Sequence, residues 1–245
     1  MHGPPSGPPW LVLPTYDEAP NIEAIVRAAH QVLSEAAPEG FRILVVDDDS
    51  PDGTGVIADR LAAELAEVAV LHRRAREGLG PAYLAGFDHA LDAGAGYVLE
   101  MDADFSHDPA DLPRLLDAVR SGRADLALGS RYVDGGGVQD WSLLRRLVSR
   151  GGSAYAAAML SLPQRDLTGG FKCFRREVLE TIDLPSVRSK GYAFQVELTY
   201  RATLAGFRVL EVPIVFRDRV RGQSKMSWRI ATEAAWLVPQ LRRRG

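Results

Sequence analysis

Short apolar runs rich in β-branched residues alternate with helical patterns from residue 10 to about residue 130. The predicted strands cover residues 10–13, 42–46, 68–71, 97–101 and 126–129, and the predicted helices cover residues 21–36, 55–66, 81–93 and 108–121. Because alternation at this spacing builds β-α-β units, it predicts a mostly parallel sheet flanked by helices. The fold class is therefore α/β, and the chemistry is expected at the carboxyl ends of the strands.

The second half of the chain departs from this alternation after residue 130. Its predicted elements are a Gly-rich loop over 134–138, a helix or helix pair over 143–160, an extended segment over 167–174, a helix over 194–205 and a strand over 208–216. No repeat or low-complexity linker divides the halves, so both are interpreted as one catalytic domain over 10–230. Residues 1–9 are interpreted as a flexible Pro/Gly-rich leader without the apolar run of a signal peptide, and 231–245 as a basic amphipathic tail.

Two acidic clusters follow predicted strands. Asp102-Ala103-Asp104 comes directly after the strand 97–101, and Asp47-Asp48-Asp49 follows the strand 42–46. A lone D-x-D is equally compatible with an ordinary acidic loop. Two acidic strand ends in one half-chain, however, are costly unless something cationic or hydrogen-bonding lies between them. Carboxylates so placed can bind a Mg²⁺ or Mn²⁺ that is shared with substrate phosphates.

Two further strand ends carry residues suited to a nucleotide or a phosphate. Pro14-Thr15-Tyr16-Asp17-Glu18 leads into a predicted helix, whose free N–H groups and positive dipole end attract anions; a plain turn and cap is the alternative. Arg73, Arg76 and Gly78-Leu79-Gly80 follow the third strand and could contact phosphate. Neither G-x-x-x-x-G-K-[ST] nor a helix-opening G-x-G-x-x-G is present, which counts against a P-loop NTPase or an NAD enzyme.

Charge and cysteine content narrow the function classes further. The net charge of -3 gives no overall basic field for nucleic acid. Basic residues instead gather at Arg145, Arg146 and Arg150 and again near the end of the chain, opposite in sequence to the acidic first half. This separation of acidic and basic segments suits a phosphorylated substrate that is bound between the two. The single cysteine, Cys173, excludes an internal disulfide and suits a reducing cytoplasm.

Several motifs together resemble one enzyme family. P-T-Y-D-E, V-V-D-D-D-S-P-D-G-T, G-L-G, M-D-A-D-F-S-H and G-S-R-Y occur in the order and approximate spacing of an inverting family 2 glycosyltransferase with a GT-A, Rossmann-like fold. Within that family the chain is most similar to the polyprenyl-phosphate (dolichyl-phosphate) mannosyltransferases, in particular the actinobacterial polyprenol monophosphomannose synthases. T-G-G-F, G-Y-A-F-Q-V-E and R-V-R-G-Q-S-K extend the resemblance over about residues 10–230.

The resemblance implies transfer of mannose from GDP-mannose to a membrane polyprenyl phosphate, with Mg²⁺ or Mn²⁺. It assigns the metal to Asp102 and Asp104. Ser106 stands where some relatives carry Gln as a further ligand, so Ser106 or a water is expected there. The acceptor phosphate is assigned to Arg131 and Arg219, which complete the expected catalytic set. The donor nucleotide and diphosphate are assigned to Pro14, Tyr16, Glu18, Asp47, Asp49, Arg76, Ala103, Ser224 and Lys225.

The same chemistry can be argued from the residues. Breaking a sugar–phosphate bond requires neutralising the leaving diphosphate, which a metal held by Asp102 and Asp104 would do. A phosphate monoester is already an anion, so it needs positioning by guanidinium groups such as Arg131 and Arg219 more than it needs a base. Surface ion pairing is the alternative for both arginines. Two other functions stay open: the same reaction with a UDP-sugar such as UDP-glucose, and a non-catalytic membrane-surface binding protein, against which the intact motifs argue.

Two polar side chains and two amphipathic segments have open interpretations. Glu197 could contact sugar hydroxyls or pair with Arg201, and His107 could support a metal ligand or cap the helix that starts near Asp108. Residues 141–150 and 226–244 mix apolar and basic residues in the manner of interfacial helices, and each either packs on the domain or lies on a membrane. The resemblance agrees with a peripheral location at the cytoplasmic face of the membrane, sometimes through a membrane-anchoring protein partner.

Overall fold

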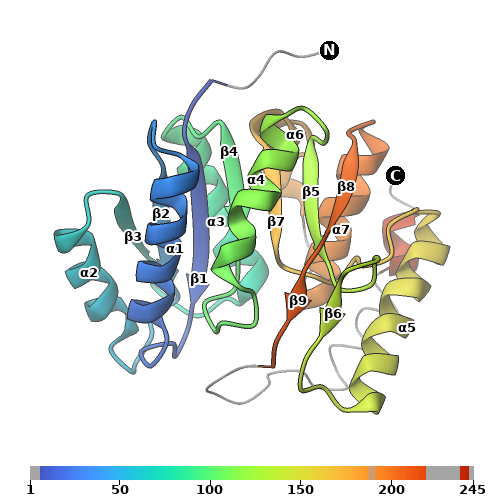
Figure 1. Cartoon of the computed structure of the whole chain (residues 1–245), viewed down its shortest axis with the longest axis horizontal. Coiled ribbons are helices and arrows are strands. Elements are labelled where there is room, and N and C mark those ends of the chain that lie inside the picture. The colour runs from blue at the N-terminus through green and yellow to red at the C-terminus, as the bar shows by residue number, and fades with distance from the viewer. Residues whose placement is uncertain (1–5, 188, 190, 219–237, 243–245) are drawn as a thin grey trace.

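The computed structural model describes residues 6–187, 189, 191–218 and 238–242. A seven-stranded sheet with the order β3-β2-β1-β4-β7-β5-β8 forms its centre (Figure 1). All neighbouring strands are parallel except β7, which is antiparallel to both β4 and β5. The predicted α/β class with a mostly parallel sheet is therefore confirmed.

The strands and helices are distributed along the whole chain. The strands are β1 (Pro9–Thr15), β2 (Arg42–Asp47), β3 (Val68–His72), β4 (Tyr97–Glu100), β5 (Leu126–Ser130), β6 (Gly137–Val138), β7 (Lys172–Arg175), β8 (Val209–Pro213) and β9 (Val215–Phe216). The α-helices are α1 (Ile22–Ala36), α2 (Thr54–Glu64), α3 (Leu79–Asp92), α4 (Leu112–Arg120), α5 (Leu143–Leu160), α6 (Arg176–Thr181) and α7 (Gly191–Leu204). Two short 3-10 helices lie at Pro109–Asp111 and Leu184–Ser186.

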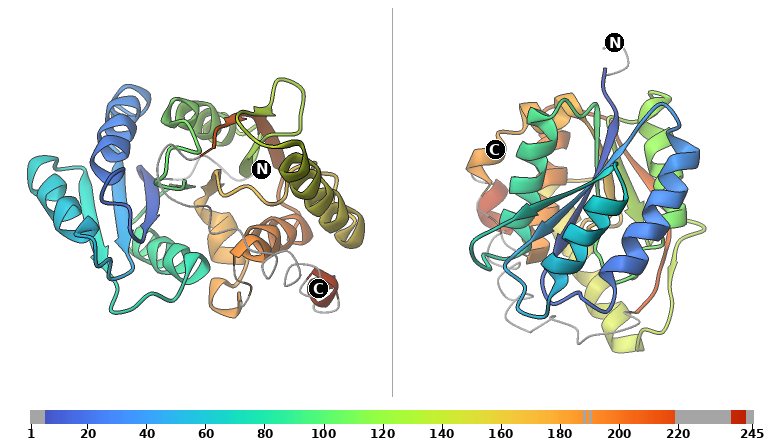
Figure 2. Two further views of the ribbon diagram at one scale, coloured as in Figure 1. Left: turned by 90° about the horizontal axis from the view of Figure 1, so that it is seen from below. Right: turned by 90° about the vertical axis from the view of Figure 1, so that its left-hand side faces the viewer.

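Helices cover both faces of the sheet, so the central strands are buried on both sides. Along β1, Leu11 and Leu13 face the cluster that contains α1 and α4, whereas Trp10 and Val12 face the cluster that contains α3 and α7. Figure 2 shows these helix pairs on opposite sides of the sheet. This arrangement explains why the strands are continuous apolar runs and do not alternate between apolar and polar residues.

Packing between α3 and β1 depends on Gly86. A Cβ at this position would clash with Val12 Cγ1 and lie 3.1 Å from Val46 Cγ2. We expect Gly86→Ala to lower the free energy of unfolding by about 1–3 kcal/mol, measured by urea denaturation, because the core would be overpacked. Gly151 in α5 has open space around its Cβ direction, so Gly151→Ala is the matched control and should gain about 0.5–1 kcal/mol. Equal stability of Gly86→Ala and the wild type would contradict this packing.

The second half of the chain differs in detail from the prediction. Only the end of the expected extended segment 167–174 forms a strand, β7. The expected strand 208–216 divides into β8 and β9, and β9 pairs with β6 inside the predicted Gly-rich loop. Residues 143–160 form one helix, α5. Because β5, β7 and β8 lie in the same sheet as β1 to β4, both halves share one core.

The ends of the chain are only partly described. β1 begins at Pro9, one residue before the predicted strand, and the Pro8 carbonyl accepts a hydrogen bond from Gly96 N. Residues 238–242 are helical, and Val238 and Leu241 are buried against α5 and α7. The other residues of the predicted amphipathic segment 226–244 and of the tail 231–245, namely 226–237 and 243–245, lie outside the described residues. Within the described part of the chain, no helix combines the length and apolar character needed to cross a membrane.

Candidate functional site

A cavity of about 330 Å³ lies at the carboxyl ends of β1, β4 and β5. Several of the sequence-predicted site residues line it, namely Pro14, Tyr16, Glu18, Arg76, Asp102, Ala103, Asp104, Ser106 and Arg131. Its other walls come from the start of α3, from α5 and from the loop 168–170. The topology thus brings residues that are far apart in sequence to the edge where open α/β sheets place their ligands.

The D-x-D pair lies just beyond β4 and is held from two sides. The Tyr83 hydroxyl donates to Asp102 Oδ1 at 3.2 Å, and Ser106 N donates to Asp104 Oδ1 at 3.0 Å. Burial and the nearby carboxylates raise the pKa of Tyr83 well above its ordinary value, so its hydroxyl remains a donor. Phe105, with φ of 60°, makes the tight turn between Asp104 and Ser106.

The residues around this pair fit a divalent metal ion shared with a substrate. Ser106 Oγ is buried beside the cavity and has no hydrogen-bond partner among the described residues. No group of three or more His, Cys, Asp or Glu side chains in the described part of the chain could hold an ion without help. Two carboxylates and a hydroxyl match the way Mg²⁺ is usually bound, with few protein ligands and with waters and substrate phosphates supplying the rest.

The end of β1 and the segment after β3 form a second wall. The Arg76 guanidinium lies over the Tyr16 ring at 4.0 Å from its centroid, and both side chains line the cavity. Glu18 is held there because its backbone N donates to Thr54 Oγ1 at 2.9 Å. A stacked cation and aromatic ring beside a carboxylate can contact a nucleoside diphosphate through stacking, hydrogen bonds and charge.

In the acidic cluster after β2, the aspartate that lines the cavity is not one of the two that were assigned to the nucleotide. Asp47 is buried and closes the turn, accepting from Ser50 Oγ at 2.6 Å and from Thr15 Oγ1 at 3.2 Å. Asp49 is exposed, with φ of 57°. Neither lines the cavity, and their assignment to the nucleotide stays a prediction. Asp48, which the sequence analysis did not assign, does line it and pairs with Arg73.

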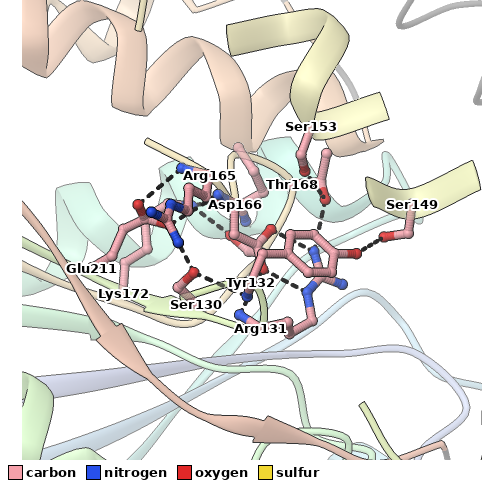
Figure 3. A network of polar contacts seen from close by, with 12 residues as sticks. Ser130, Arg131, Tyr132, Ser149, Ser153, Arg165, Asp166, Thr168, Lys172 and Glu211 are labelled. Carbon is pink, nitrogen blue, oxygen red and sulfur yellow. Dashed lines mark hydrogen bonds and ion pairs between the residues drawn. The ribbon is translucent and has the colours of Figure 1, made fainter. Parts of the chain in front are cut away.

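Arg131 is more enclosed than the sequence indicates. Its side chain is only 5% exposed, and its Nε and Nη2 donate to Asp166 at 2.7 and 2.6 Å (Figure 3). The ion pair and these hydrogen bonds raise the pKa of Arg131 despite the opposing effect of burial. Arg131 therefore forms an ion pair, but it does so inside the cavity wall and not at the surface. A contact with an acceptor phosphate would have to use the guanidinium N–H groups that do not bind Asp166.

Arg145 lines the cavity, although it was predicted only as part of an amphipathic helix. Its guanidinium carbon lies 4.3 Å from the centroid of the Trp141 ring, and Nη1 donates to Asp218 at 2.7 Å. Its Nε is buried without a partner among the described residues. The four-residue spacing of Arg145 and Ser149 on α5, which both line the cavity, is the signal that could have identified this face.

The structure shows the neighbours of the two polar side chains with open interpretations. Glu197 pairs with Arg201, whose Nε lies 2.9 Å away, and does not line the cavity. His107 does line it, enclosed by the Phe171 and Phe216 rings, and burial lowers its pKa to about 4. The helix cap belongs to Asp108, whose side chain accepts from Ala110 N.

Three predicted site residues, Arg219, Ser224 and Lys225, lie outside the described residues. Their assignments to the acceptor phosphate and the donor diphosphate therefore stay predictions. The segment that precedes them does approach the site, because Phe216 lines the cavity and Arg217 N donates to the Ser106 carbonyl at 3.1 Å.

The chain is similar in sequence to two known proteins. The chain is 50% identical over 236 residues to polyprenol monophosphomannose synthase of Mycolicibacterium smegmatis, covering 96% of this chain and 87% of that protein. It is 48% identical over 223 residues to undecaprenyl-phosphate mannosyltransferase of Micrococcus luteus, covering 91% and 89%.

The fold has solved counterparts. Glucosyl-3-phosphoglycerate synthase from Mycobacterium tuberculosis, in complex with Mn²⁺, UDP and glucosyl-3-phosphoglycerate, superposes with a TM-score of 0.68. The match covers 98% of this chain and 80% of that one at 17% sequence identity, so it establishes the shared fold alone. Residues 10–183 match the family described as glycosyl transferase family 2. The matched range includes the D-x-D pair and Arg131. This chain is therefore a member of glycosyltransferase family 2.

Proposed function

We propose that this protein transfers mannose from GDP-mannose to a polyprenyl monophosphate, giving polyprenyl-phosphate β-mannose. The observation that carries the proposal is one cavity lined by the acidic pair Asp102 and Asp104 and by three arginines, Arg76, Arg131 and Arg145. A sugar diphosphate donor with its metal and an anionic acceptor need these opposite charges close together. The names of the two mannosyltransferase relatives support the choice of sugar and acceptor.

The donor would lie against the acidic pair and against the wall formed by the end of β1 and the segment after β3. Asp102 and Asp104 would hold Mg²⁺ or Mn²⁺ with the donor diphosphate, and the ion would neutralise the charge that develops on the leaving group. Tyr16, Glu18 and Arg76 would contact the nucleoside and its phosphates. The sugar would then be placed between this wall and the arginines on the opposite side.

The acceptor phosphate would lie against Arg131 and Arg145. A phosphate monoester is already an anion near neutral pH, so attack on the anomeric carbon needs alignment and no strong general base. Guanidinium groups supply that alignment through directed N–H donors. A single displacement inverts the anomeric carbon, so an α-linked donor gives a β-linked product.

A parallel transfer assay tests the proposal. Radiolabelled GDP-mannose, UDP-glucose and UDP-GlcNAc would each be incubated with polyprenyl phosphate and Mg²⁺, Mn²⁺ or EDTA. Label in the lipid phase from GDP-mannose alone, lost with EDTA, is the expected result. Label from a UDP-sugar alone would contradict the assignment of GDP-mannose as the donor. Absence of transfer from every donor would contradict the proposed reaction.

A polyprenyl acceptor also requires contact with a membrane surface, and we assign that contact to α5. Leu143, Leu144 and Leu147 on this helix are 77%, 68% and 71% exposed, beside the exposed Arg146 and Arg150. The same helix contributes Arg145 and Ser149 to the cavity wall. Apolar side chains between arginines suit an anionic bilayer surface, and their helix would place that surface beside the proposed acceptor site.

We expect Leu144→Ser/Leu147→Ser to weaken binding to vesicles that contain anionic lipid by about tenfold or more, because two apolar side chains lose their contact with the bilayer. Vesicle flotation measures this loss. Val56 on α2, 74% exposed at the opposite edge of the molecule, offers the matched control Val56→Ser (Figure 1). Equal vesicle binding by the double variant and the control would contradict the role of α5.

A further inference from the structure

A buried carboxylate behind the cavity wall, Asp166, has no role in the proposed reaction itself. Asp166 lies in the loop between α5 and β7, and its side chain is 0% exposed. Its Oδ2 accepts from both Arg131 N at 2.9 Å and Arg131 Nε at 2.7 Å, and its Oδ1 accepts from Nη2 at 2.6 Å. One carboxylate therefore fixes both the backbone and the side chain of Arg131, directly after β5 ends.

The loop that carries Asp166 is itself anchored to the sheet. Glu211 in β8 accepts from Asp166 N and from Arg165 N, each at 2.9 Å, and from Ser130 Oγ at 2.7 Å (Figure 3). Two residues beyond Asp166, Thr168 Oγ1 accepts from Arg131 Nη2 at 2.8 Å. The guanidinium is thus held by a loop that cannot shift without breaking contacts to β5 and β8.

These contacts leave a defined part of Arg131 for a ligand. The hydrogen bonds of its guanidinium with other described residues use Nε and Nη2, and none uses Nη1. The rings of Tyr132, Trp141 and Phe216 have their centroids 5.2 to 5.6 Å from the guanidinium carbon, which limits its other orientations. Burial alone would raise the pKa of Asp166, but the Arg131 charge and the hydrogen bonds lower it, so the carboxylate stays ionised.

We propose that Asp166, with Thr168, is a positioning residue for the acceptor phosphate. It holds the Arg131 guanidinium in one orientation in the cavity wall, with Nη1 left to bind the phosphate oxygen. It also compensates the buried positive charge before the acceptor arrives, which an uncompensated arginine in this place would not tolerate. This inference rests on the proposed function, because it takes the acceptor to be a phosphate.

The same geometry recurs away from the cavity and supplies a matched control. Asp125, just before β5, accepts from Arg208 N at 2.9 Å, from Nε at 3.2 Å and from Nη2 at 3.3 Å. Neither Asp125 nor Arg208 lines the cavity. Asp125, unlike Asp166, also lies 3.6 Å from the Arg175 guanidinium. Asp125→Asn and Asp166→Asn therefore each remove a charge that holds an arginine through its N, Nε and Nη2, but only Asp166 holds an arginine that lines the cavity.

Steady-state kinetics with GDP-mannose and polyprenyl phosphate test the inference. Asp166→Asn should raise the KM for polyprenyl phosphate by about 10- to 100-fold, because its amide would turn a donor toward Arg131 and release the guanidinium. The KM for GDP-mannose should stay unchanged, and Asp125→Asn should change neither KM. Thermal unfolding of both variants separates this effect from a general loss of stability.

The outcomes separate the inference from the function on which it rests. A folded Asp166→Asn variant with the acceptor KM of the wild type would overturn the inference, as would an equal rise in both KM values. If Asp166→Asn does not fold, Thr168→Val removes the second partner of Nη2, and an unchanged acceptor KM in that variant would overturn the inference. A wild-type protein that transfers no mannose to polyprenyl phosphate would instead contradict the proposed function.

Discussion

Asp104→Asn is expected to lower kcat/KM for mannosyl transfer by about 1,000-fold or more while the protein stays folded. Asn keeps an oxygen that can accept from Ser106 N, so the turn after β4 is retained. Asn removes the negative charge that would hold the metal, and with the metal the neutralisation of the leaving diphosphate is lost. That neutralisation contributes several kcal/mol to the stability of the transition state. Each loss of about 1.4 kcal/mol lowers the rate tenfold.

Calorimetric titration with GDP-mannose and Mn²⁺ should show that Asp104→Asn also loses the metal-dependent part of donor binding. Asp108→Asn is the matched control on the same loop, because Asp108 caps the next helix and Asn caps equally well. Turnover that is unchanged in Asp104→Asn would remove Asp104 from the metal site.

Lys172→Met is expected to lower the free energy of unfolding by about 3–5 kcal/mol, or the melting temperature by roughly 6–20 °C. Lys172 is fully buried and donates to Glu100 Oε1 and to the Gly169 carbonyl, each at 2.8 Å, and to Gln195 Oε1. Removing only the cation leaves Glu100 as a buried charge without its counter-charge. Thermal unfolding followed by circular dichroism measures the loss.

The double variant Glu100→Met/Lys172→Met tests the cause of that loss. Replacing both charges by apolar side chains of similar size should recover most of the stability, because no buried charge is left unpaired. A double variant less stable than Lys172→Met alone would show that the pair is not the origin of the effect. The comparison is made on stability only, since Glu100 lies two residues before Asp102.

The parts of the fold that local patterns determine were predictable from the sequence. Continuous apolar runs separated by helical patterns identify β1 to β5 and α1 to α4, and hence the edge at which Asp102 and Asp104 lie. The antiparallel insertion of β7 between β4 and β5 was not predictable. It rests on pairing between Glu100 and Lys172, which are distant in sequence and meet only in the folded sheet.

The site was predictable to the same extent. The D-x-D pair was expected from its place after a strand and Arg131 from the family resemblance, and all three residues line the cavity. Which of the three consecutive aspartates lines it depends on the turn after β2, which directs Asp47 to Ser50 and Asp48 to Arg73. Likewise, the charge compensation of Arg131 by Asp166 spans 35 residues and leaves no local pattern. Long-range side-chain pairing thus accounts for most of what the sequence did not reveal.

The anomeric configuration of the lipid product tests the central claim most directly. Wild-type protein would be incubated with GDP-mannose, polyprenyl phosphate and Mg²⁺ or Mn²⁺, and the purified lipid analysed by mass spectrometry and NMR. A single displacement at the cavity predicts a polyprenyl-phosphate mannose with a β-linkage. An α-linked product, or mannose released to water without a lipid product, would contradict direct attack by an acceptor phosphate held at Arg131 and Arg145.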